Sequence, residues 1–461
     1  MSQLISRRTA ITSTASALAA SLAPWPLWGM SRSDLRLPLS SDLDGHTLVQ
    51  RVGAADFARV ERLGVSRAGR GIDLICVGSG PRAALIVGAP HANEPIGCAT
   101  IARMLERLAG DRELREHSGW QWHFIPAIDI DGIALNEGWF RGERTFPRYL
   151  ADFYRPPFRL QPEYTFPLEL PGYRFDTSTP ENACWRRALE QVRPQLQCSL
   201  HGADTGGSFF ILSDLRASLR TALADLPQTQ GITLNTVGDS SANLRELGPG
   251  MFAFPDIDSL IAKAAALHRQ PDQVWNAGDS SAGYSAKRFG TFNMVCEVPL
   301  WRDARERDSR SSGRSLAEVI GDQIQLLRAD ESLLKPFLPA LAAKANGSEA
   351  RALLASVQEA VLHTDGAVDE LSEGRAAPSA QRALAYRDLV QYEAGTAGFR
   401  TLAMAQRLAR LTDIQDIAAA AGEELAKRLK SFERSARLVP VPLSAATDLQ
   451  MAAILATARS V

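Results

Sequence analysis

Residues 83–97 read AALIVGAPHANEPIG, an apolar run that ends in a polar turn. The run AALIV is typical of a buried strand, and the proline-containing turn after it precedes a helical pattern. His91 and Glu94 lie in this turn, three residues apart. A histidine and a carboxylate are costly in an apolar core, but at a solvent-facing strand end they can bind a ligand. The stretch therefore predicts either an ordinary polar loop or a binding site.

The composition excludes several classes of protein. A length of 461 residues allows two or three domains. Hydrophobic and charged contents of 45% and 22% are those of a globular protein, and a net charge of -1 gives no reason to expect a nucleic-acid partner. After the N-terminal leader, no segment is long and apolar enough to span a bilayer. The five cysteines are scattered and mostly lie in apolar runs, so we expect buried thiols.

Residues 1–30 have the pattern of a leader. Arg7 and Arg8 precede a weakly apolar stretch of Ala, Ser and Thr. This arrangement resembles a twin-arginine export signal, although Ala10 and Ile11 stand where phenylalanine and leucine are often found. We expect a secreted or periplasmic protein; the alternative is a cytoplasmic protein with an N-terminal leader.

The remainder of the chain divides into two regions. Short β-rich runs alternate with helical patterns over residues 45–305, which predicts an α/β domain with a largely buried sheet. A charged, Ser-rich stretch follows, DARERDSRSSGRS at residues 303–315, and reads as a linker or surface loop. Residues 316–461 are rich in Ala, Leu, Arg and Glu, with leucines at helical spacing. We expect a helical C-terminal region with a structural or partner-binding role.

Three polar residues lie at or near the ends of apolar runs, His91, His201 and Glu297. Because ligands collect at the carboxyl ends of strands in α/β sheets, we expect these side chains to converge. Catalytic zinc takes three protein ligands and leaves one position for water, and two histidines with one glutamate are a known set. Glu297 would be a costly unpaired acid at the end of a buried strand unless it served such a site.

Five segments occur in the order found in a known family: LGVSRAGRGIDLICVG, HANEPIG, DIDGIALNEGWFRG, YRFDTSTPENACWRRALEQVRPQLQCSLHG and GTFNMVCEVPLW. From about Leu63 to Arg302, the chain resembles the zinc metallocarboxypeptidases, which include carboxypeptidase A and relatives of the succinylglutamate desuccinylase and aspartoacylase type. The resemblance implies an α/β fold with a mixed, mainly parallel sheet flanked by helices. Here it is followed by the α-helical C-terminal region.

The resemblance also implies the roles of five residues. His91, Glu94 and His201 would bind one zinc ion per chain. Glu297 would be the general base that activates the water and passes its proton to the departing amine. Arg141 matches an arginine that stabilises the developing oxyanion.

Two further residues are expected to bind substrate. Arg174 suits a substrate carboxylate, because its guanidinium can make two parallel hydrogen bonds. Tyr173 stands before it where the family usually has asparagine, and Trp275 aligns with the family's mobile tyrosine. Tyr284 lies nearer Glu297 in sequence and could supply the missing hydroxyl.

The best interpretation is a zinc metallopeptidase, a carboxypeptidase-like hydrolase that cleaves an amide bond of a peptide with a free carboxylate. Two alternatives remain. The first is an N-acyl amino acid deacylase, because HANEP is closer to the deacylase branch. The second is a non-catalytic binding protein on the same fold. In each case the aromatic-rich residues 142–175 are expected to form a wall of the cleft.

Overall fold

The run AALIV lies within β3 (Arg82–Gly88), a central strand of a ten-stranded mixed sheet. Four strands at the centre run parallel: β4 (Trp120–Ile125), β3, β7 (Leu196–Thr205) and β11 (Phe292–Asp303). They are buried almost throughout, as expected for parallel strands that are covered on both faces. Their parallel direction places the carboxyl ends of β3, β7 and β11 at the same edge of the sheet.

Mostly antiparallel strands complete the sheet on both sides. The order is β1-β2-β4-β3-β7-β11-β8-β10-β9, and β14 pairs with β11 outside this path. The flanking strands are β1 (Ala58–Val65), β2 (Gly71–Val77), β8 (Phe209–Leu212), β9 (Glu246–Gly248), β10 (Met251–Ala253) and β14 (Leu438–Pro440). Two separate hairpins pair β5 (Leu168–Leu170) with β6 (Tyr173–Phe175) and β12 (Ser311–Ser315) with β13 (Ala383–Ala385).

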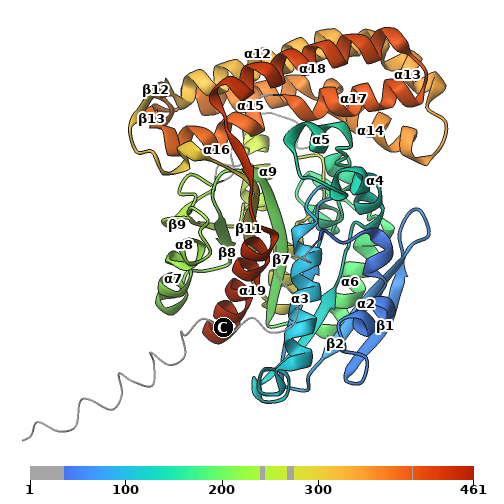
Figure 1. The fold of residues 1–461 in the computed structure, drawn as a ribbon, viewed down its shortest axis with the longest axis vertical. Coiled ribbons are helices and arrows are strands. Elements are labelled where there is room, and N and C mark those ends of the chain that lie inside the picture. Colours follow the sequence, from blue (N-terminus) through green and yellow to red (C-terminus); the bar gives the residue numbers. More distant parts are fainter. Residues whose placement is uncertain (1–35, 239–243, 267–274, 397) are drawn as a thin grey trace, which may run out of the picture. The chain divides into compact units, whose positions relative to one another are not determined.

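The computed structural model describes residues 36–461, apart from 239–243, 267–274 and 397. The leader predicted at residues 1–30 lies outside this part of the chain. Among the described residues, no helix combines the length and apolar character needed to cross a membrane. The predicted fold class is confirmed: a mixed sheet with a parallel centre is flanked by helices and followed by a helical C-terminal region (Figure 1).

Helices cover both faces of the sheet. On one face, α3 (Ile96–Gly110) and α19 (Leu443–Ser460) pack against each other and over β3, β7 and β11. α3 approaches β7 so closely that a Cβ at Gly97 would lie 2.7 Å from the Leu200 Cβ, so a glycine is needed there. α6 (Pro180–Val192) and α11 (Ser281–Phe289) lie on the other face, where Trp185 and Ser281 meet Gln197.

Sequence signals set the ends of these helices. Thr179 caps α6 by accepting a hydrogen bond from the Asn182 N–H, and a proline occupies the first helical position. Ser280 caps α11 in the same way, and Gly290 ends it with a positive φ of 70°. Further helices lie in other connections: α2 (Gly45–Arg51), α4 (Ile130–Phe140), α5 (Phe146–Ala151), α7 (Ala217–Ala224), α8 (Leu226–Thr229) and α9 (Ile257–Ala266).

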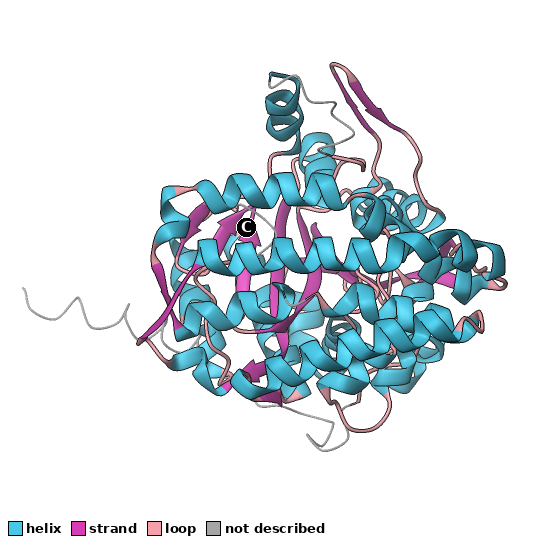
Figure 2. Ribbon diagram, turned by 90° about the horizontal axis from the view of Figure 1, so that it is seen from above, coloured by secondary structure: helices cyan, strands magenta, loops and turns pink. Residues whose placement is uncertain are grey.

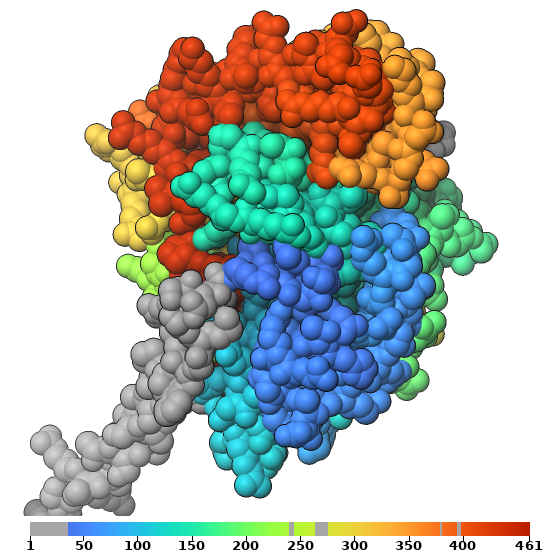
Figure 3. All heavy atoms as spheres, turned by 45° about the vertical axis from the view of Figure 1, so that its right-hand side comes forward, coloured from blue at the N-terminus to red at the C-terminus, as the bar shows by residue number. Residues whose placement is uncertain are grey.

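The C-terminal helices lie across the carboxyl edge of the central strands (Figures 1 and 2). They are α12 (Leu316–Leu334), α13 (Leu338–Lys344), α14 (Ser348–Leu362), α15 (Thr364–Ala376), α16 (Tyr386–Thr396), α17 (Phe399–Leu411) and α18 (Gln415–Ser435). Figure 3 shows this layer packed on the segment around α4 and α5, and α17 contacts α5 directly. The region is also part of the sheet, because β14 pairs with the end of β11.

Gln450 on α19 ties the C-terminal region to two central strands. Its buried amide Nε2 donates to the carbonyl oxygens of His201 (2.8 Å) and Cys296 (3.2 Å), on neighbouring strands β7 and β11. Its Oε1 accepts a hydrogen bond from the Thr100 hydroxyl of α3 at 2.6 Å. One side chain therefore connects α3, α19, β7 and β11 directly behind the carboxyl edge.

We predict that Gln450→Leu lowers the free energy of unfolding by about 2–3 kcal/mol, because it leaves buried acceptors and a hydroxyl without partners. Urea denaturation monitored by tryptophan fluorescence measures this change. The exposed residue Gln50 offers a matched control, and Gln50→Leu should shift the free energy by less than about 0.5 kcal/mol. Equal stabilities of the two variants would contradict the role given to Gln450.

Candidate metal centre

Strand register brings three predicted residues together. His201 on β7 and Glu297 on β11 are directly paired neighbours in the parallel ladder. Gly88 at the end of β3 pairs with Leu200, so the turn that carries His91 begins beside His201. Ala89 in this turn has a φ of +47°, a left-handed conformation that costs an alanine about 1 kcal/mol and reverses the chain sharply. The convergence expected from the strand ends is therefore present.

Glu94 lies between the two imidazoles. Its Oε1 is 2.8 Å from the His91 Nδ1, and its Oε2 is 3.2 Å from the His201 Nδ1. The Gly202 N–H donates to Oε2 at 3.2 Å, and the Arg155 guanidinium donates to Oε1 at 3.0 Å. His91, Glu94 and His201 are each only 4% exposed. The structure thus unites the three predicted ligands around their Nδ1 atoms.

A second carboxylate, that of Glu163, lies on the opposite side of the imidazoles. Its Oε2 is 3.0 Å from the His201 Nε2 and 3.5 Å from the His91 Nε2. Neither this oxygen nor the His91 Nε2 has a hydrogen-bond partner, although both are buried. The His201 Nε2 also lies within hydrogen-bond distance of the Ser199 hydroxyl, at 3.1 Å.

The two carboxylates define two faces of the cluster. We call the side that carries Glu94, Glu297 and Arg155 the Nδ1 face, and the side that carries Glu163 the Nε2 face. Glu297 is half-buried, and its Oε1 lies 3.7 Å from the His201 Nδ1. The predicted base is therefore on the same face as Glu94.

The proximity of these groups shifts their pKa values. Burial, together with the Arg155 charge, lowers the pKa of His91. Burial also acts to lower the pKa of His201, but Glu163 and Glu94 outweigh it and raise that pKa well above its usual value. Burial acts to raise the pKa of both carboxyls. The histidines nevertheless hold the pKa of Glu94 well below its ordinary range and that of Glu163 at about 2. Two carboxylates thus lie on opposite sides of the imidazoles, and the pKa of each is held below its ordinary range.

The donor set fits a zinc-type ion. Imidazole nitrogens and carboxylate oxygens are the ligands of catalytic zinc sites, and buried polar atoms without partners are rare in native proteins. His91, Glu163 and His201 offer ligand atoms that lie within 4.8 Å of one another. With Glu94 on the other face, the two imidazoles have a carboxylate ligand available on either side.

Three other predicted residues lie away from this cluster. Arg141 follows α4, is 63% exposed and pairs with Glu137 at 3.1 Å. Arg174 on the β5–β6 hairpin is 69% exposed, and its Nε lies 3.3 Å from Asp176. The Tyr284 hydroxyl lies 3.5 Å from a Glu190 carboxylate oxygen. The structure therefore does not bring Arg141, Arg174 or Tyr284 to the imidazoles, because each is directed to a local surface partner.

The aromatic segment 142–175 supplies the residues that sequence reasoning missed. Arg155 contacts Glu94, Glu163 lies against both histidines, and the Tyr164 ring stacks on His91 with centroids 5.8 Å apart. Asn136 of α4 holds this segment in place by donating to the carbonyl oxygens of Ala92 (3.1 Å) and Tyr154 (2.8 Å). The sequence offers no clear signal for these residues, since Glu163 and the exposed Glu169 both stand among apolar and aromatic residues.

The C-terminal region also reaches the site. Arg400 of α17 donates from Nε and Nη2 to Asp204, which lies on β7 three residues after His201. Asp204 accepts a hydrogen bond from the buried Tyr149 hydroxyl at 2.6 Å, and Asn93 donates to that hydroxyl at 3.3 Å. A continuous polar chain therefore runs from α17 to the turn that carries His91 and Glu94.

A cavity of about 180 Å³ lies between residues 153–161 of the aromatic segment and helices α14 and α17. Arg155 and Arg400 both line it, together with Phe153, Phe158, Ser356, Glu359 and Met404 among others. Because Arg155 also touches Glu94, this cavity adjoins the cluster. It combines an apolar wall with two guanidinium groups.

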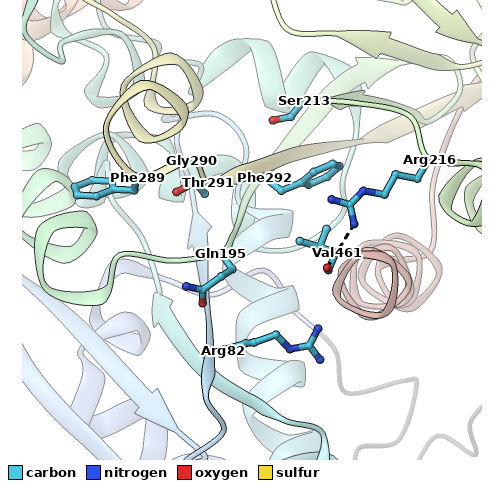
Figure 4. A pocket seen from close by; sticks show the side chains of 9 residues that line it. All are labelled: Arg82, Gln195, Ser213, Arg216, Phe289, Gly290, Thr291, Phe292 and Val461. Atoms are coloured by element: carbon cyan, nitrogen blue, oxygen red, sulfur yellow. Dashed lines mark hydrogen bonds between the residues drawn. The ribbon is translucent and has the colours of Figure 1, made fainter.

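A larger cavity, of about 320 Å³, lies at the opposite edge of the sheet (Figure 4). It is lined by Arg82 and Phe292, the first residues of β3 and β11, and by Gln195 just before β7. Arg216 faces the same cavity and contacts the carbonyl oxygen of Val461. These residues lie at the amino ends of the central strands, remote from the histidine cluster.

Comparison with protein families supports the motif-based resemblance. The family model of the zinc carboxypeptidases (Peptidase_M14) matches residues 49–148, about a fifth of the chain. The predicted resemblance to the zinc metallocarboxypeptidases is therefore confirmed. The matched segment contains His91 and Glu94, whereas His201 and Glu297 lie beyond it.

No curated protein matches the chain significantly. Among solved structures, a metallo-carboxypeptidase from Burkholderia cenocepacia is 16% identical with a TM-score of 0.34, and the match covers 55% of this chain and 58% of that one. Carboxypeptidase A from Helicoverpa armigera is 15% identical with a TM-score of 0.38, over 62% of this chain and 70% of that one. The match thus spans less than two thirds of the Burkholderia protein.

Proposed function

We propose that the protein is a zinc-dependent hydrolase that cleaves an amide bond in a peptide substrate with a free carboxylate. One observation carries the proposal. Two histidines and two glutamates, His91, Glu94, His201 and Glu297, meet at the carboxyl ends of three neighbouring strands. The family match over residues 49–148 supports the same class of enzyme.

His91, Glu94 and His201 would hold the ion on the Nδ1 face. When bound at such a site, zinc polarises a carbonyl group and lowers the pKa of water to about 7. Glu297 lies on this face, so its carboxylate is placed to accept the proton of the attacking water and to deliver it to the departing amine. The surrounding burial excludes water and strengthens each of these electrostatic interactions.

Arg155 is the guanidinium best placed to bind the substrate carboxylate. It contacts Glu94 with Nη1, lines the 180 Å³ cavity and is a quarter exposed. Arg400 lines the same cavity from the C-terminal region, and two guanidinium groups beside an apolar wall suit an anionic group attached to an apolar side chain. By contrast, Arg174 lies on an exposed hairpin.

The rival activity is N-acyl amino acid deacylation on the same centre. Both classes of substrate carry a carboxylate, so Arg155 does not discriminate between them. A carboxyl-terminal peptidase should turn over a blocked dipeptide faster than an N-succinyl or N-acetyl amino acid. The reverse order would favour the deacylase.

We predict that Glu297→Gln lowers kcat on the preferred substrate by at least about 100-fold, because the amide cannot accept the proton of water. Zinc content, measured by elemental analysis, should stay at one ion per chain because Glu297 is not among the proposed ligands. Glu113→Gln is the control, since that side chain is 84% exposed and should leave kcat unchanged. Wild-type turnover by Glu297→Gln would remove this residue from the mechanism.

We further predict that Arg155→Met lowers kcat/KM for a carboxylate substrate by about 10- to 100-fold, the loss expected for a hydrogen bond to a charged group. The same substrate with a C-terminal amide should lose much less. Arg174→Met is the matched comparison and should leave both kcat/KM values close to wild type. A large loss of kcat/KM with Arg174→Met and none with Arg155→Met would show that the substrate carboxylate binds at the hairpin and not at Arg155.

A further inference from the structure

We propose that Glu163 is a positioning residue of the metal centre, whose carboxylate accepts the Nε2–H groups of both imidazoles when an ion is held at their Nδ1 atoms. The inference rests on the metal site of the proposed function and assigns a role to a residue that lies outside the predicted ligand set. It starts from two buried atoms without partners, the His91 Nε2 and the Glu163 Oε2, which lie 3.5 Å apart.

The proton on His91 explains why these two atoms lack partners. Its Nδ1 lies 2.8 Å from the Glu94 Oε1, and because an ionised carboxylate only accepts hydrogen bonds, this contact places the hydrogen of the neutral ring on Nδ1. A nitrogen that binds a metal ion carries no hydrogen, so an ion at Nδ1 leaves the neutral imidazole protonated at Nε2. That hydrogen then faces the Glu163 oxygen. The two unpartnered atoms are therefore a donor and an acceptor for the ion-bound tautomer.

The same carboxylate serves the second histidine. The Glu163 Oε2 lies 3.0 Å from the His201 Nε2, which is also 3.1 Å from the Ser199 hydroxyl. Histidines that bind metals commonly donate their second N–H to a carboxylate, which fixes the ring orientation and raises the basicity of the ligating nitrogen. Here one carboxylate is shared, so it also fixes the relative orientation of the two rings.

Glu163 is itself held rigidly enough for this role. It is 4% exposed, and its Oε1 accepts a hydrogen bond from the Ser281 hydroxyl of α11 at 3.1 Å. The preceding residue, Pro162, is fixed through its carbonyl oxygen, to which the buried Asn182 of α6 donates at 2.8 Å. The aromatic segment is thereby connected to both helices on this face of the sheet.

The positions of Glu297 and Arg155 decide which face holds the ion. Both lie on the Nδ1 face with Glu94, so an attacking water within reach of Glu297 must also lie there. An ion on the Nε2 face would make Glu163 a ligand and would leave Glu297 directed away from the reaction. In one arrangement Glu94 binds the ion and Glu163 orients the imidazoles, and in the other the two roles are exchanged. Substitution of each glutamate in turn therefore distinguishes the two arrangements.

The test is zinc affinity, measured by competition with a chromophoric chelator. Glu163→Gln should still bind one zinc ion per chain, with an affinity about 10- to 100-fold weaker than wild type. Glu94→Gln should lose stoichiometric binding. Glu181→Gln is the matched control, since Glu181 is fully buried and accepts hydrogen bonds from Arg67, outside the histidine cluster. It should lower thermal stability and leave zinc affinity unchanged.

A second readout uses the wild-type protein and does not depend on the folding of a variant. Nitrogen-15 NMR of the zinc-loaded chain should show both imidazoles as Nε2–H tautomers. Nδ1–H tautomers would overturn the proposal. Wild-type zinc affinity of Glu163→Gln would overturn it too. So would the reverse pattern, in which Glu163→Gln loses stoichiometric zinc binding and Glu94→Gln retains it. Absence of zinc binding by wild type would overturn the proposed function as well, whereas the other results leave a zinc centre in place.

Discussion

The carboxyl edge of the sheet depends on how the buried carboxylates of Glu94 and Glu163 are compensated by the groups around the two imidazoles. Each ion would be costly alone, because transfer of a charge into a protein interior is repaid only by close partners. Glu94 meets this requirement with four contacts, from both histidines, Arg155 and the Gly202 N–H. Glu163 meets it less completely, since one of its oxygens lacks a hydrogen bond. A divalent cation is the chemical group that would complete such a cluster.

The C-terminal helices are structurally part of this centre. Gln450 bonds the backbone carbonyl of His201 on β7 and that of Cys296, the residue before Glu297, on β11. Arg400 neutralises Asp204 on β7 and lines the cavity beside Arg155. A region for which the sequence indicated a structural or partner-binding role therefore contributes hydrogen bonds to the central strands and a guanidinium group to the cavity.

The sequence predicted the sheet, its helical extension and the meeting of His91, Glu94, His201 and Glu297. These predictions succeeded because strand ends follow from local apolar runs, and parallel strands place their ends at one edge. Arg141 was expected at the site from the order of motifs, Arg174 as a guanidinium suited to a carboxylate, and Tyr284 from its closeness to Glu297 in sequence. In the structure Arg141 and Arg174 pair with nearby carboxylates, and the Tyr284 hydroxyl lies 3.5 Å from a Glu190 oxygen.

Arg155, Glu163 and Gln450 were beyond prediction for a different reason. Arg155 and Glu163 lie in an irregular segment without periodicity, so no pattern indicates which side chain turns inward. Gln450 lies 249 residues from its partner His201, and no motif in the sequence connects the two positions. Contacts between residues so far apart in sequence are determined by tertiary packing. The sequence of a helix does not indicate which residue a buried polar side chain will bond.

The most direct measurement is the anomalous scattering of zinc in crystals of the zinc-loaded protein. The account predicts one peak within about 2.0–2.2 Å of the His91 Nδ1, the His201 Nδ1 and a Glu94 oxygen, with Glu297 beside it and not bonded to it. No peak at this cluster, or a peak bonded to the Nε2 atoms and Glu163, would contradict it.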